Sequence, residues 1–384
     1  MTHFPPETYA FRVAACREDL ERRGLSALLV FAQESQYYLF GYDGGGYVFF
    51  QCTVLTTVDR PITLLCRRPD VAQARDTSTI GDIRIWLNAE DADPAGQLRD
   101  ILVEQGLIGS SIGIEMDNYG CTGATFFAVA EAVDGICKLV DASDLVRRQR
   151  LLKSEEELVY VRAAASLADS AVAAVGECAR PGLLDSKLTA AAMAAMLEGG
   201  GDIPPAGPLV NSGRRAVYGR GVGGARVLEK QDQVVIELAA TYRRYNACIE
   251  RTLVIGKLSP KLRSIYALVE DTLLEMLEAF RPGELLGQID KIHQARLDAA
   301  GYKDQRYGAC GYSLGATFRP SWMDVPPMIY TGNPTELRPG MVFFPHVMLG
   351  DTETGLAMGL GQTLVVTETG SELLTKAPLG LIER

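Results

Sequence analysis

Hydrophobic residues along the first 150 positions alternate between helical and strand-like spacing. Glu7–Gly24 carries apolar residues at helical intervals and ends in a basic turn and a glycine, as many helices do. The continuous apolar run Leu25–Ala32 is typical of a buried strand. The same reading predicts helices at Ser35–Phe40, Pro94–Gln105 and Ala124–Ala132, and strands at Cys52–Val58, Ile62–Cys66, Ser111–Glu115 and Lys138–Asp141. This alternation predicts a small α/β domain with a mixed sheet.

The pattern changes after position 150, where a capped helix is predicted. Ser154 with Glu157 three residues later forms a capping box, and the helix is expected to reach about Ala179. Further helices are predicted at Leu184–Glu198, Leu262–Phe280 and Leu286–Ala300, with a Gly- and Arg-rich loop at Ser212–Arg226 and strands from Tyr307 onwards. Helices on one face of an antiparallel sheet define the α+β class. We therefore expect an α+β protein of two domains, residues 1–150 and 151–384.

Residues 232–255, DQVVIELAATYRRYNACIERTLVI, place polar side chains between two apolar runs. Val234–Leu238 and Leu253–Ile255 are rich in β-branched residues, which predicts two strands of one ribbon. A buried ionised carboxylate is costly unless it has a partner or a function. Because the ribbon carries Glu237 and Glu250, we expect it to form one wall of a polar pocket.

Composition and charge narrow the class of protein. The 384 residues are 47% hydrophobic and 22% charged, which is typical of a globular chain long enough for two cores. Lys and Arg number 38 against 48 Asp and Glu, a net charge of −10 that argues against nucleic acid as a partner. We also expect no membrane partner and no signal peptide. Eight scattered cysteines without a C-x-x-C pair favour reduced thiols and a cytoplasmic location.

The ribbon also carries a family resemblance. Its pattern D-x-V-x-I-[DE], followed by Y-x-x-Y-x-A-x-I-x-R-T, resembles the central hairpin of the pita-bread hydrolases, which include methionine aminopeptidase, aminopeptidase P, prolidase and creatinase. Later family motifs are resembled, in order, by Lys153–Asp169, Gly311–Gly315, Leu337–Met348 and Leu360–Gly370. Phe40–Cys52 and Gly113–Gly120 extend the resemblance to the N-terminal half, where it is closest to ectoine hydrolase and creatinase. The resemblance implies a creatinase-like N-terminal domain and a pita-bread catalytic domain.

The metal ligands of the resembled family are replaced in this chain. Its peptide-hydrolysing members hold two metal ions with two Asp, one His and two Glu. The resemblance places those positions at Glu237, Cys248, Tyr312, His346 and Gly361. Two hard divalent ions need several carboxylates together. We therefore expect no metal site and no cofactor, with a single soft metal on Cys248 and His346 as the alternative.

Candidate catalytic groups lie in the same motifs. His346 is expected to act as general acid or base, because histidine titrates near neutrality, unless it is only a buried, hydrogen-bonded histidine. Cys248 is either a core thiol or a nucleophile activated by His346. Glu250 matches a creatinase glutamate in the tripeptide E-R-T, and it either pairs with a nearby arginine or anchors a cationic substrate group. Tyr312 is expected to stabilise a developing oxyanion. Glu237 is the remaining candidate catalytic residue.

Substrate-binding residues are expected from both domains. Arg220 stands where creatinase and ectoine hydrolase carry a catalytic histidine, and guanidinium groups such as those of Arg220 and Arg319 bind carboxylates in a bidentate manner. Asn246 and Trp322 are expected in the pocket wall. By resemblance to creatinase-like dimers, the loop with Tyr47 and Phe49 is expected to reach the partner subunit's pocket.

These observations combine into one hypothesis with three alternatives. The hypothesis is a cytoplasmic, homodimeric, metal-independent hydrolase that cleaves a C–N bond in a small polar substrate with a carboxylate: an amide, a cyclic amidine or a guanidino acid. The alternatives are an Xaa-Pro aminopeptidase or prolidase with an atypical metal site, a catalytically inactive binding scaffold, and a lyase-type enzyme on the same fold. Stimulation by Mn²⁺ or Co²⁺ would favour the first of these, and saturable binding without turnover would favour the second.

Overall fold

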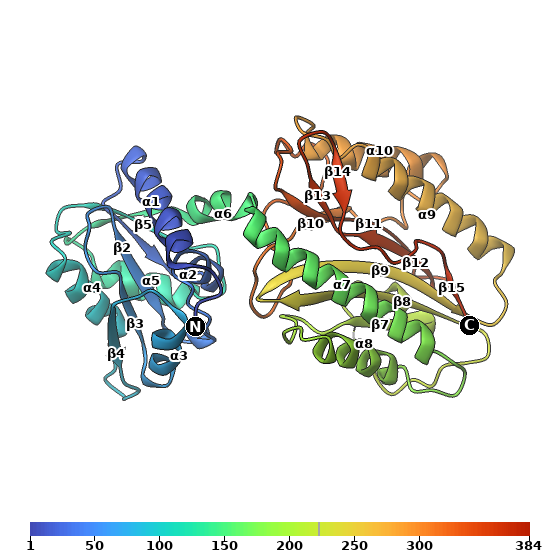
Figure 1. Ribbon diagram of the computed structural model, residues 1–384, viewed down its shortest axis with the longest axis horizontal. Coiled ribbons are helices and arrows are strands. Elements are labelled where there is room, and N and C mark those ends of the chain that lie inside the picture. Colours follow the sequence, from blue (N-terminus) through green and yellow to red (C-terminus); the bar gives the residue numbers. More distant parts are fainter. Residues whose placement is uncertain (222) are drawn as a thin grey trace. The chain divides into compact units, whose positions relative to one another are not determined.

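The structure of the protein is a computed structural model that describes residues 1–221 and 223–384. The chain divides into two compact units, Met1–Arg150 and Leu151–Arg384. Figure 1 shows the elements of each unit. Val222, within the predicted Gly- and Arg-rich loop, lies outside the described residues.

The N-terminal unit is built on a six-stranded mixed sheet of order β4-β3-β2-β1-β5-β6. At its centre β1 (Ala27–Val30) runs antiparallel to β2 (Cys52–Thr56) and parallel to β5 (Ser111–Ile114). The outer strands are β3 (Thr63–Arg67), β4 (Asp82–Trp86) and β6 (Lys138–Asp141). The helices are α1 (Pro6–Arg22), α2 (Gln33–Phe40), α3 (Val71–Thr77), α4 (Pro94–Glu104), α5 (Gly123–Ala132) and α6 (Ser143–Leu151), with 3-10 turns η1 (Gly46–Val48) and η2 (Arg68–Asp70).

Alternation along β1 produces a hydrophobic core on each face of this sheet. Leu28 and Val30 pack with residues of α1 and α2, whereas Ala27 and Leu29 pack with residues of α4 and α5. The predicted mixed α/β domain is therefore confirmed. The sequence patterns had not predicted α3 and β4, which are short and only partly buried.

The C-terminal unit contains a nine-stranded sheet. Its main order is β14-β13-β11-β12-β9-β8-β7, with β10 paired to β11 and β15 paired to β9. All its pairings are antiparallel except that of β15 with β9. The strands are β7 (Leu209–Ser212), β8 (Asp232–Tyr242), β9 (Tyr245–Ile255), β10 (Gly311–Ser313), β11 (Val342–Asp351), β12 (Leu356–Gln362), β13 (Leu364–Val366), β14 (Ser371–Leu373) and β15 (Ile382–Glu383), and η3 (Gly213–Val217) follows β7.

The ribbon predicted at residues 232–255 is confirmed as β8 and β9, the longest strands of this sheet. Each strand continues through polar residues that the apolar runs did not include. The turn between them places Arg243 and Arg244 at φ values of 51° and 69°, which non-glycine residues adopt uncommonly. Asp202 supports this turn by accepting a 2.9 Å hydrogen bond from the Arg244 backbone N–H.

Two helix pairs cover one face of the sheet: α7 (Glu155–Cys178) with α8 (Ser186–Glu198), and α9 (Pro260–Glu278) with α10 (Leu286–Ala299). Ile236 of β8 belongs to a core with the first pair, and Val347 of β11 to a core with the second. Their chain neighbours, Glu237 and His346, point to the other face, as strand geometry requires. The α+β class of this unit is confirmed.

Helix α7 begins with the predicted capping box. Ser154 accepts from the Glu157 backbone N–H, and the Glu157 carboxylate accepts from the Ser154 backbone N–H at 2.9 Å. The other oxygen of Glu157 accepts a 2.7 Å hydrogen bond from Tyr245, at the start of β9. The cap therefore also anchors the ribbon.

The sequence analysis expected no membrane partner, yet by length and composition α7 passes for a membrane span. Its most apolar window has a mean hydropathy of 1.5, and half of that window is buried. The helix also carries Arg162, which pairs with Glu372, and Asp169, which accepts from the Lys376 backbone N–H. The buried side of α7 packs on β8 and β9, so its apolar character is explained by the core.

Candidate functional site

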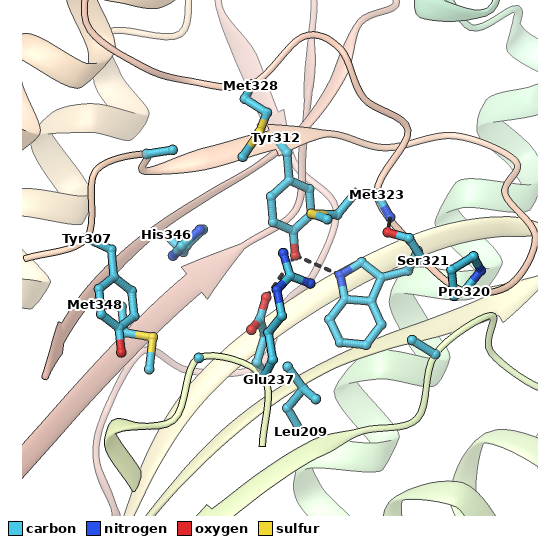
Figure 2. A pocket seen from close by; sticks show the side chains of 15 residues that line it. Leu209, Glu237, Tyr307, Tyr312, Pro320, Ser321, Met323, Met328, His346 and Met348 are labelled. Carbon is cyan, nitrogen blue, oxygen red and sulfur yellow. Dashed lines mark hydrogen bonds between the residues drawn. The ribbon is translucent and has the colours of Figure 1, made fainter. Parts of the chain in front are cut away.

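A cavity of about 550 Å³ opens on the sheet face opposite the helices of the C-terminal unit. Glu237 of β8 and His346 of β11 line it, together with Tyr312 of β10. Figure 2 shows these three side chains directed toward the same space. Further lining residues come from β7, from β11 and from the segment between β10 and β11, among them Leu209, Met348, Pro320, Trp322, Met323 and Met328.

Strand register aligns the polar residues of this face in one transverse row. Glu237 pairs with Glu250 across β8 and β9. Glu250 pairs in turn with Gly361 of β12, which pairs with His346 of β11. Two strand pairs far apart in sequence, β8–β9 and β11–β12, therefore bring two carboxyl groups and one imidazole into one row.

Tyr312 connects Trp322 to Glu237. The Trp322 Nε1–H donates to the Tyr312 hydroxyl at 2.7 Å, and that hydroxyl donates to Glu237 Oε1 at 2.8 Å (Figure 2). A tyrosine hydroxyl has a single proton, so Tyr312 uses it on Glu237. In this arrangement the Tyr312 hydroxyl orients the Glu237 carboxyl group. The sequence analysis had expected that hydroxyl to donate to a substrate oxyanion, and the structure instead directs it to Glu237.

Burial shifts the pKa of each group in the row. It raises the pKa of Glu237, although the hydrogen bond from Tyr312 and the charge of Arg220 oppose the shift. Burial and the neighbouring Glu237 raise the pKa of Glu250 well above its usual range. Burial lowers the pKa of His346 to about 3. At neutral pH the imidazole is therefore neutral.

Glu250 and His346 face each other without being hydrogen-bonded. His346 Nδ1 lies 3.6 Å from Glu250 Oε2. Within the described part of the chain, neither carboxyl oxygen of Glu250 nor His346 Nδ1 has a hydrogen-bond partner. Buried polar atoms are almost always satisfied in native proteins, so this pair marks a place where a water molecule or a ligand belongs.

Arg251 is not the partner of the Glu250 carboxyl group, which was one alternative considered for that residue. The guanidinium of Arg251 is fully buried and donates to the backbone carbonyls of Gly361, Ala377 and Pro378, among others. It joins β9 to β12 and to the C-terminal segment. Glu250 is also fully buried and is not among the described residues that line the cavity, whereas its neighbours His346 and Glu237 are.

Phe344 occupies the space next to Gly361. A Cβ atom on Gly361 would lie 2.4 Å from the Phe344 ring and 2.9 Å from the Cβ of His346. The same ring stacks on His346, with a centroid distance of 5.4 Å and an interplanar angle of 21°. The position that carries a glutamate in the resembled family is therefore filled by an aromatic ring.

Cys248 is completely buried two residues before Glu250. Burial raises the pKa of its thiol well above the usual range, and the nearby Glu237 raises it further. Cys248 does not appear among the described lining residues of the cavity. A thiol that is buried and protonated is typical of a core cysteine, whereas a nucleophilic cysteine needs an accessible thiolate.

Asn246 is committed to the ribbon and its neighbouring loop. Its Oδ1 accepts from the Thr241 hydroxyl at 2.7 Å, and its Nδ2 donates to Thr317 Oγ1 at 2.9 Å and to the Gly315 carbonyl at 3.1 Å. Because both ends of its amide are hydrogen-bonded within the protein, Asn246 ties the ribbon to the neighbouring loop.

The two arginines expected to act as carboxylate clamps differ in position. Arg220 lines the cavity, and its positive charge favours the ionised form of Glu237. Arg319 is exposed and is not among the described lining residues, although its neighbours Pro320 and Ser321 are. Only Arg220 is therefore placed to meet a substrate carboxylate inside this cavity.

Tyr47 and Phe49 belong to the N-terminal unit. Tyr47 is nearly buried at 8% exposure, whereas Phe49 is 48% exposed. The guanidinium of Arg67 lies 3.8 Å from the centre of the Phe49 ring. An exposed aromatic ring of this kind is suited to a contact with another surface.

The five positions at which the resembled family binds two metals do not fit such a centre here. Of the five, only Glu237 has a carboxylate, and one of its oxygens accepts from Tyr312. Cys248 is held as a thiol, and the Phe344 ring fills the space beside Gly361. Two divalent ions need bridging carboxylates that this arrangement lacks.

Comparison with known proteins establishes the family. Residues 159–368, more than half of the chain, match the model of metallopeptidase family M24, and residues 12–152 match the creatinase/prolidase N-terminal domain. The chain belongs to the M24 creatinase/prolidase family of hydrolases, as its motifs predicted.

Named relatives cover most or all of the chain. Ectoine hydrolase of Halomonas elongata is 27% identical over 392 residues, which span 98% of this chain and 97% of the relative. Xaa-Pro dipeptidase of Pyrococcus furiosus is 29% identical over 239 residues, which span 62% of this chain and 67% of the relative.

Solved structures share the fold at lower identity. Prolidase from Thermococcus sibiricus superposes with a TM-score of 0.88 at 20% identity, covering 98% of this chain and 99% of that one. Xaa-Pro dipeptidase from Bacillus anthracis gives a TM-score of 0.84 at 22% identity, covering 98% of this chain and all of that one. These likenesses show the fold alone.

Several cavity residues were missed by the sequence analysis, chiefly Tyr307 and the methionines. Tyr307 donates to the Val217 carbonyl at 2.8 Å and so fixes the loop that follows η3. Phe344 was detectable, because it precedes His346 by two positions on one strand and must share its face. Met323 and Met328 lie in an irregular segment, for which no periodicity gives such a signal.

Proposed function

We propose that this M24-family protein hydrolyses a C–N bond in a small carboxylate-bearing substrate without a dinuclear metal centre. One observation carries the proposal: a neutral His346, whose Nδ1 has no hydrogen-bond partner among the described residues, lines the cavity 3.6 Å from the buried carboxyl group of Glu250. A neutral imidazole can accept a proton from a water molecule at the reacting carbon.

Glu250 would act as the positioning partner of His346. Burial disfavours an isolated imidazolium, so proton uptake by His346 needs a nearby group that can offset the positive charge. Glu250 would serve as that group in its ionised form, since its Oε2 lies 3.6 Å from His346 Nδ1. This arrangement follows the logic of a histidine supported by an acidic residue in hydrolytic triads.

The opposite side of the cavity is suited to bind the substrate. Arg220 would hold the carboxylate by a charge-assisted hydrogen bond. Glu237 lines the cavity whereas Glu250 does not, which supports Glu237 as the anchor for an amidine, guanidino or ammonium group. Tyr312 and Trp322 would fix the orientation of Glu237.

The remaining wall supports a substrate with an apolar portion. Met323, Met328 and Met348 line the cavity together with Leu209 and the indole of Trp322. Flexible methionine side chains adapt to ligands of irregular shape. We expect an N-acyl or cyclic derivative of an amino acid with an apolar side chain to bind better than its small polar counterpart.

The test is a substrate panel offered to protein freed of metal by dialysis against a chelator. The panel contains carboxylate-bearing amides, cyclic amidines and guanidino acids, each in a polar and an apolar form, and the release of amine or ammonia is measured. We expect turnover by the chelator-treated protein, and a loss of at least about 100-fold in kcat for His346→Asn. Glu229→Gln, an exposed carboxylate outside the row, serves as the control.

A second function has one observation in its favour, the similarity to proteins named Xaa-Pro dipeptidase. It predicts cleavage of Xaa-Pro dipeptides that requires added Mn²⁺ or Co²⁺. If such cleavage appeared and the chelator-treated protein turned over nothing in the panel, the metal-independent proposal would be wrong. Saturable ligand binding without any turnover would instead favour a binding scaffold.

A further inference from the structure

A second cluster of reactive side chains lies away from the cavity. Asp290 and His293 are three residues apart on α10, which places them on one face of the helix. Cys310 comes directly before β10 and meets them from another segment. All three are buried, with exposures of 0%, 1% and 1%. One potential ligand atom from each lies within 4.8 Å of the other two.

Surrounding hydrogen bonds hold the carboxyl group of this cluster in place. Asp290 Oδ2 accepts from Gln294 Nε2 at 2.7 Å and from Thr331 Oγ1 at 2.5 Å, and His293 Nδ1 lies 3.3 Å from Asp290 Oδ1. These contacts fix the orientation of the carboxyl group, as the neighbours of metal ligands usually do.

We propose that Asp290, His293 and Cys310 bind a single divalent transition ion of the zinc type. A thiolate, an imidazole and a carboxylate are the three donor types that Zn²⁺ takes in proteins. Ligands about 2.0–2.3 Å from a tetrahedral ion lie roughly 3.5 Å from one another, so donors within 4.8 Å need only small movements to coordinate it. The fourth position is left for a small oxygen donor.

Charge balance supports a dication at this place. Binding would release the Cys310 thiol proton to solvent, and the resulting thiolate and the Asp290 carboxylate would neutralise the two positive charges. The neighbouring cation, Arg306, is paired with Asp298 at 2.6 Å. Its charge is therefore offset locally and does not need the cluster.

A metal here would join α10 to the start of β10, which carries Tyr312 two residues after Cys310. Its role would be structural, since none of its three ligands is among the described residues that line the cavity. One metal ion per chain in the purified protein would therefore be compatible with metal-independent chemistry in the cavity. The two proposals stand or fall separately.

The experiment is a Co²⁺ titration of the full chain, prepared without a metal affinity resin and dialysed against a chelator. Cobalt bound by a thiolate shows a near-ultraviolet charge-transfer band that reports the ligand directly. We expect about one Co²⁺ per chain with this band, and a rise in Tm when Zn²⁺ is added to the same protein. Cys310→Ser and His293→Gln are expected to bind at least about 10-fold more weakly.

Two matched variants identify the site. Cys248→Ser and His346→Asn change the soft ligands beside the cavity, and we expect both to keep the wild-type band and stoichiometry. The proposal is overturned if folded wild-type protein, checked by circular dichroism, shows no thiolate band. It is equally overturned if the band survives in Cys310→Ser or disappears in Cys248→Ser. Hydrolysis by chelator-treated protein is scored independently, so failure here leaves the proposed function untouched.

Discussion

Protonation of single residues is decided by burial on the cavity face of the sheet. Glu237 and Glu250 pair across two strands, and enclosing two like charges together is costly. His346, at the far end of the row, is enclosed without a hydrogen-bond partner at Nδ1 among the described residues. Burial therefore shifts the pKa of each titratable group in the row toward its uncharged form, and such perturbed groups are common at catalytic sites.

The first prediction concerns the effect of His346 on stability at acidic pH. The unfolded chain binds a proton at this histidine below about pH 6.5, whereas the folded protein does so only near pH 3. Stability from this group therefore falls as pH drops from about 6.5 toward 3. Between pH 7 and pH 4.5, wild type should lose about 2–3 kcal/mol more than His346→Asn in urea unfolding.

His3→Asn serves as the control for this measurement, since it removes a histidine from the N-terminal unit. It should lose stability in parallel with wild type. If His346→Asn also paralleled wild type, the imidazole would not be buried in its neutral form, and the basis of the proposed chemistry would be removed.

The second prediction concerns Cys248. Because its thiol is buried and protonated, it should react slowly with iodoacetamide, and Cys248→Ala should retain kcat within about threefold of wild type. The partial exposure of Cys178 makes it an internal reference for alkylation. Rapid inactivation that tracks labelling of Cys248 by mass spectrometry would restore the nucleophile mechanism.

The third prediction separates the two arginines. Arg220→Ala should raise KM for a carboxylate-bearing substrate by about 10- to 100-fold, because a charge-assisted hydrogen bond is lost. Arg319→Ala should leave KM within about twofold. The matched pair is measured with the substrate and with its carboxamide, for which the Arg220 effect should largely disappear. The opposite ranking of the two arginines would show that the cavity is not the binding site.

The sequence could predict residue types at this scale but not their contacts. Glu237, His346, Tyr312 and Trp322 were all expected near one pocket, and all four line the cavity. Cys248 and Asn246 share a strand face with Glu250, yet both are fully buried and neither is among the described lining residues. Alternation gives the face of a strand, whereas the boundary between cavity and core depends on which distant segment packs there.

At the scale of elements, β11 and β12 together determine what the site can hold. Phe344 and His346 point to the same side of β11, and Gly361 of β12 leaves room for both. The backbone of Gly361 is not in the left-handed region, so only the neighbouring side chains limit a substitution there. The ring of Phe344 therefore fits beside position 361 only because that residue is a glycine.

The fourth prediction tests that pair by a double-mutant cycle. Gly361→Glu should lower the free energy of unfolding by about 2 kcal/mol or more, because its Cβ would meet the Phe344 ring. Phe344→Ala makes room, so the double variant should recover at least about 1 kcal/mol relative to additivity. Gly370→Glu is the control, because a Cβ added at that position would meet nothing within 4 Å. Strict additivity in urea unfolding would show that the two positions do not compete for space.

The central ribbon shows why element boundaries were harder to predict than element types. Its apolar runs marked both strands, but β8 and β9 extend through Ala239–Tyr242 and Tyr245–Thr252, where the pattern is polar or mixed. Tertiary partners supply what the local pattern lacks: Thr363 Oγ1 accepts from the Cys248 backbone N–H, and Thr252 donates to the Gly359 carbonyl. Contacts with β12 and its flanking segment therefore hold these residues in an extended strand conformation.

At the scale of the whole molecule, two domains were predictable from length and from the change in hydrophobic pattern near position 150. The M24 family was predictable because its motifs recur in order along the chain. The poor fit to a dinuclear centre was also readable at the five replaced positions. The cavity's methionine-rich wall was not, since it depends on how an irregular segment folds over the sheet.

The last prediction concerns assembly, where we expect a homodimer in which the Tyr47 and Phe49 loop completes the partner subunit's pocket. Phe49→Ala would then impair the partner's site, and His346→Asn its own. In a co-expressed mixture, about half of the dimers pair one chain of each type, and one of their two sites combines an intact loop with an intact His346. The mixture should regain about a quarter of wild-type activity, well above either parent variant alone.

Phe127→Ala, which changes another exposed aromatic residue of the N-terminal unit, is the control and should not impair activity in any combination. Activity of the mixture no higher than the average of the parents, in a sample shown by sedimentation to be dimeric, would mean that each site is completed within one chain.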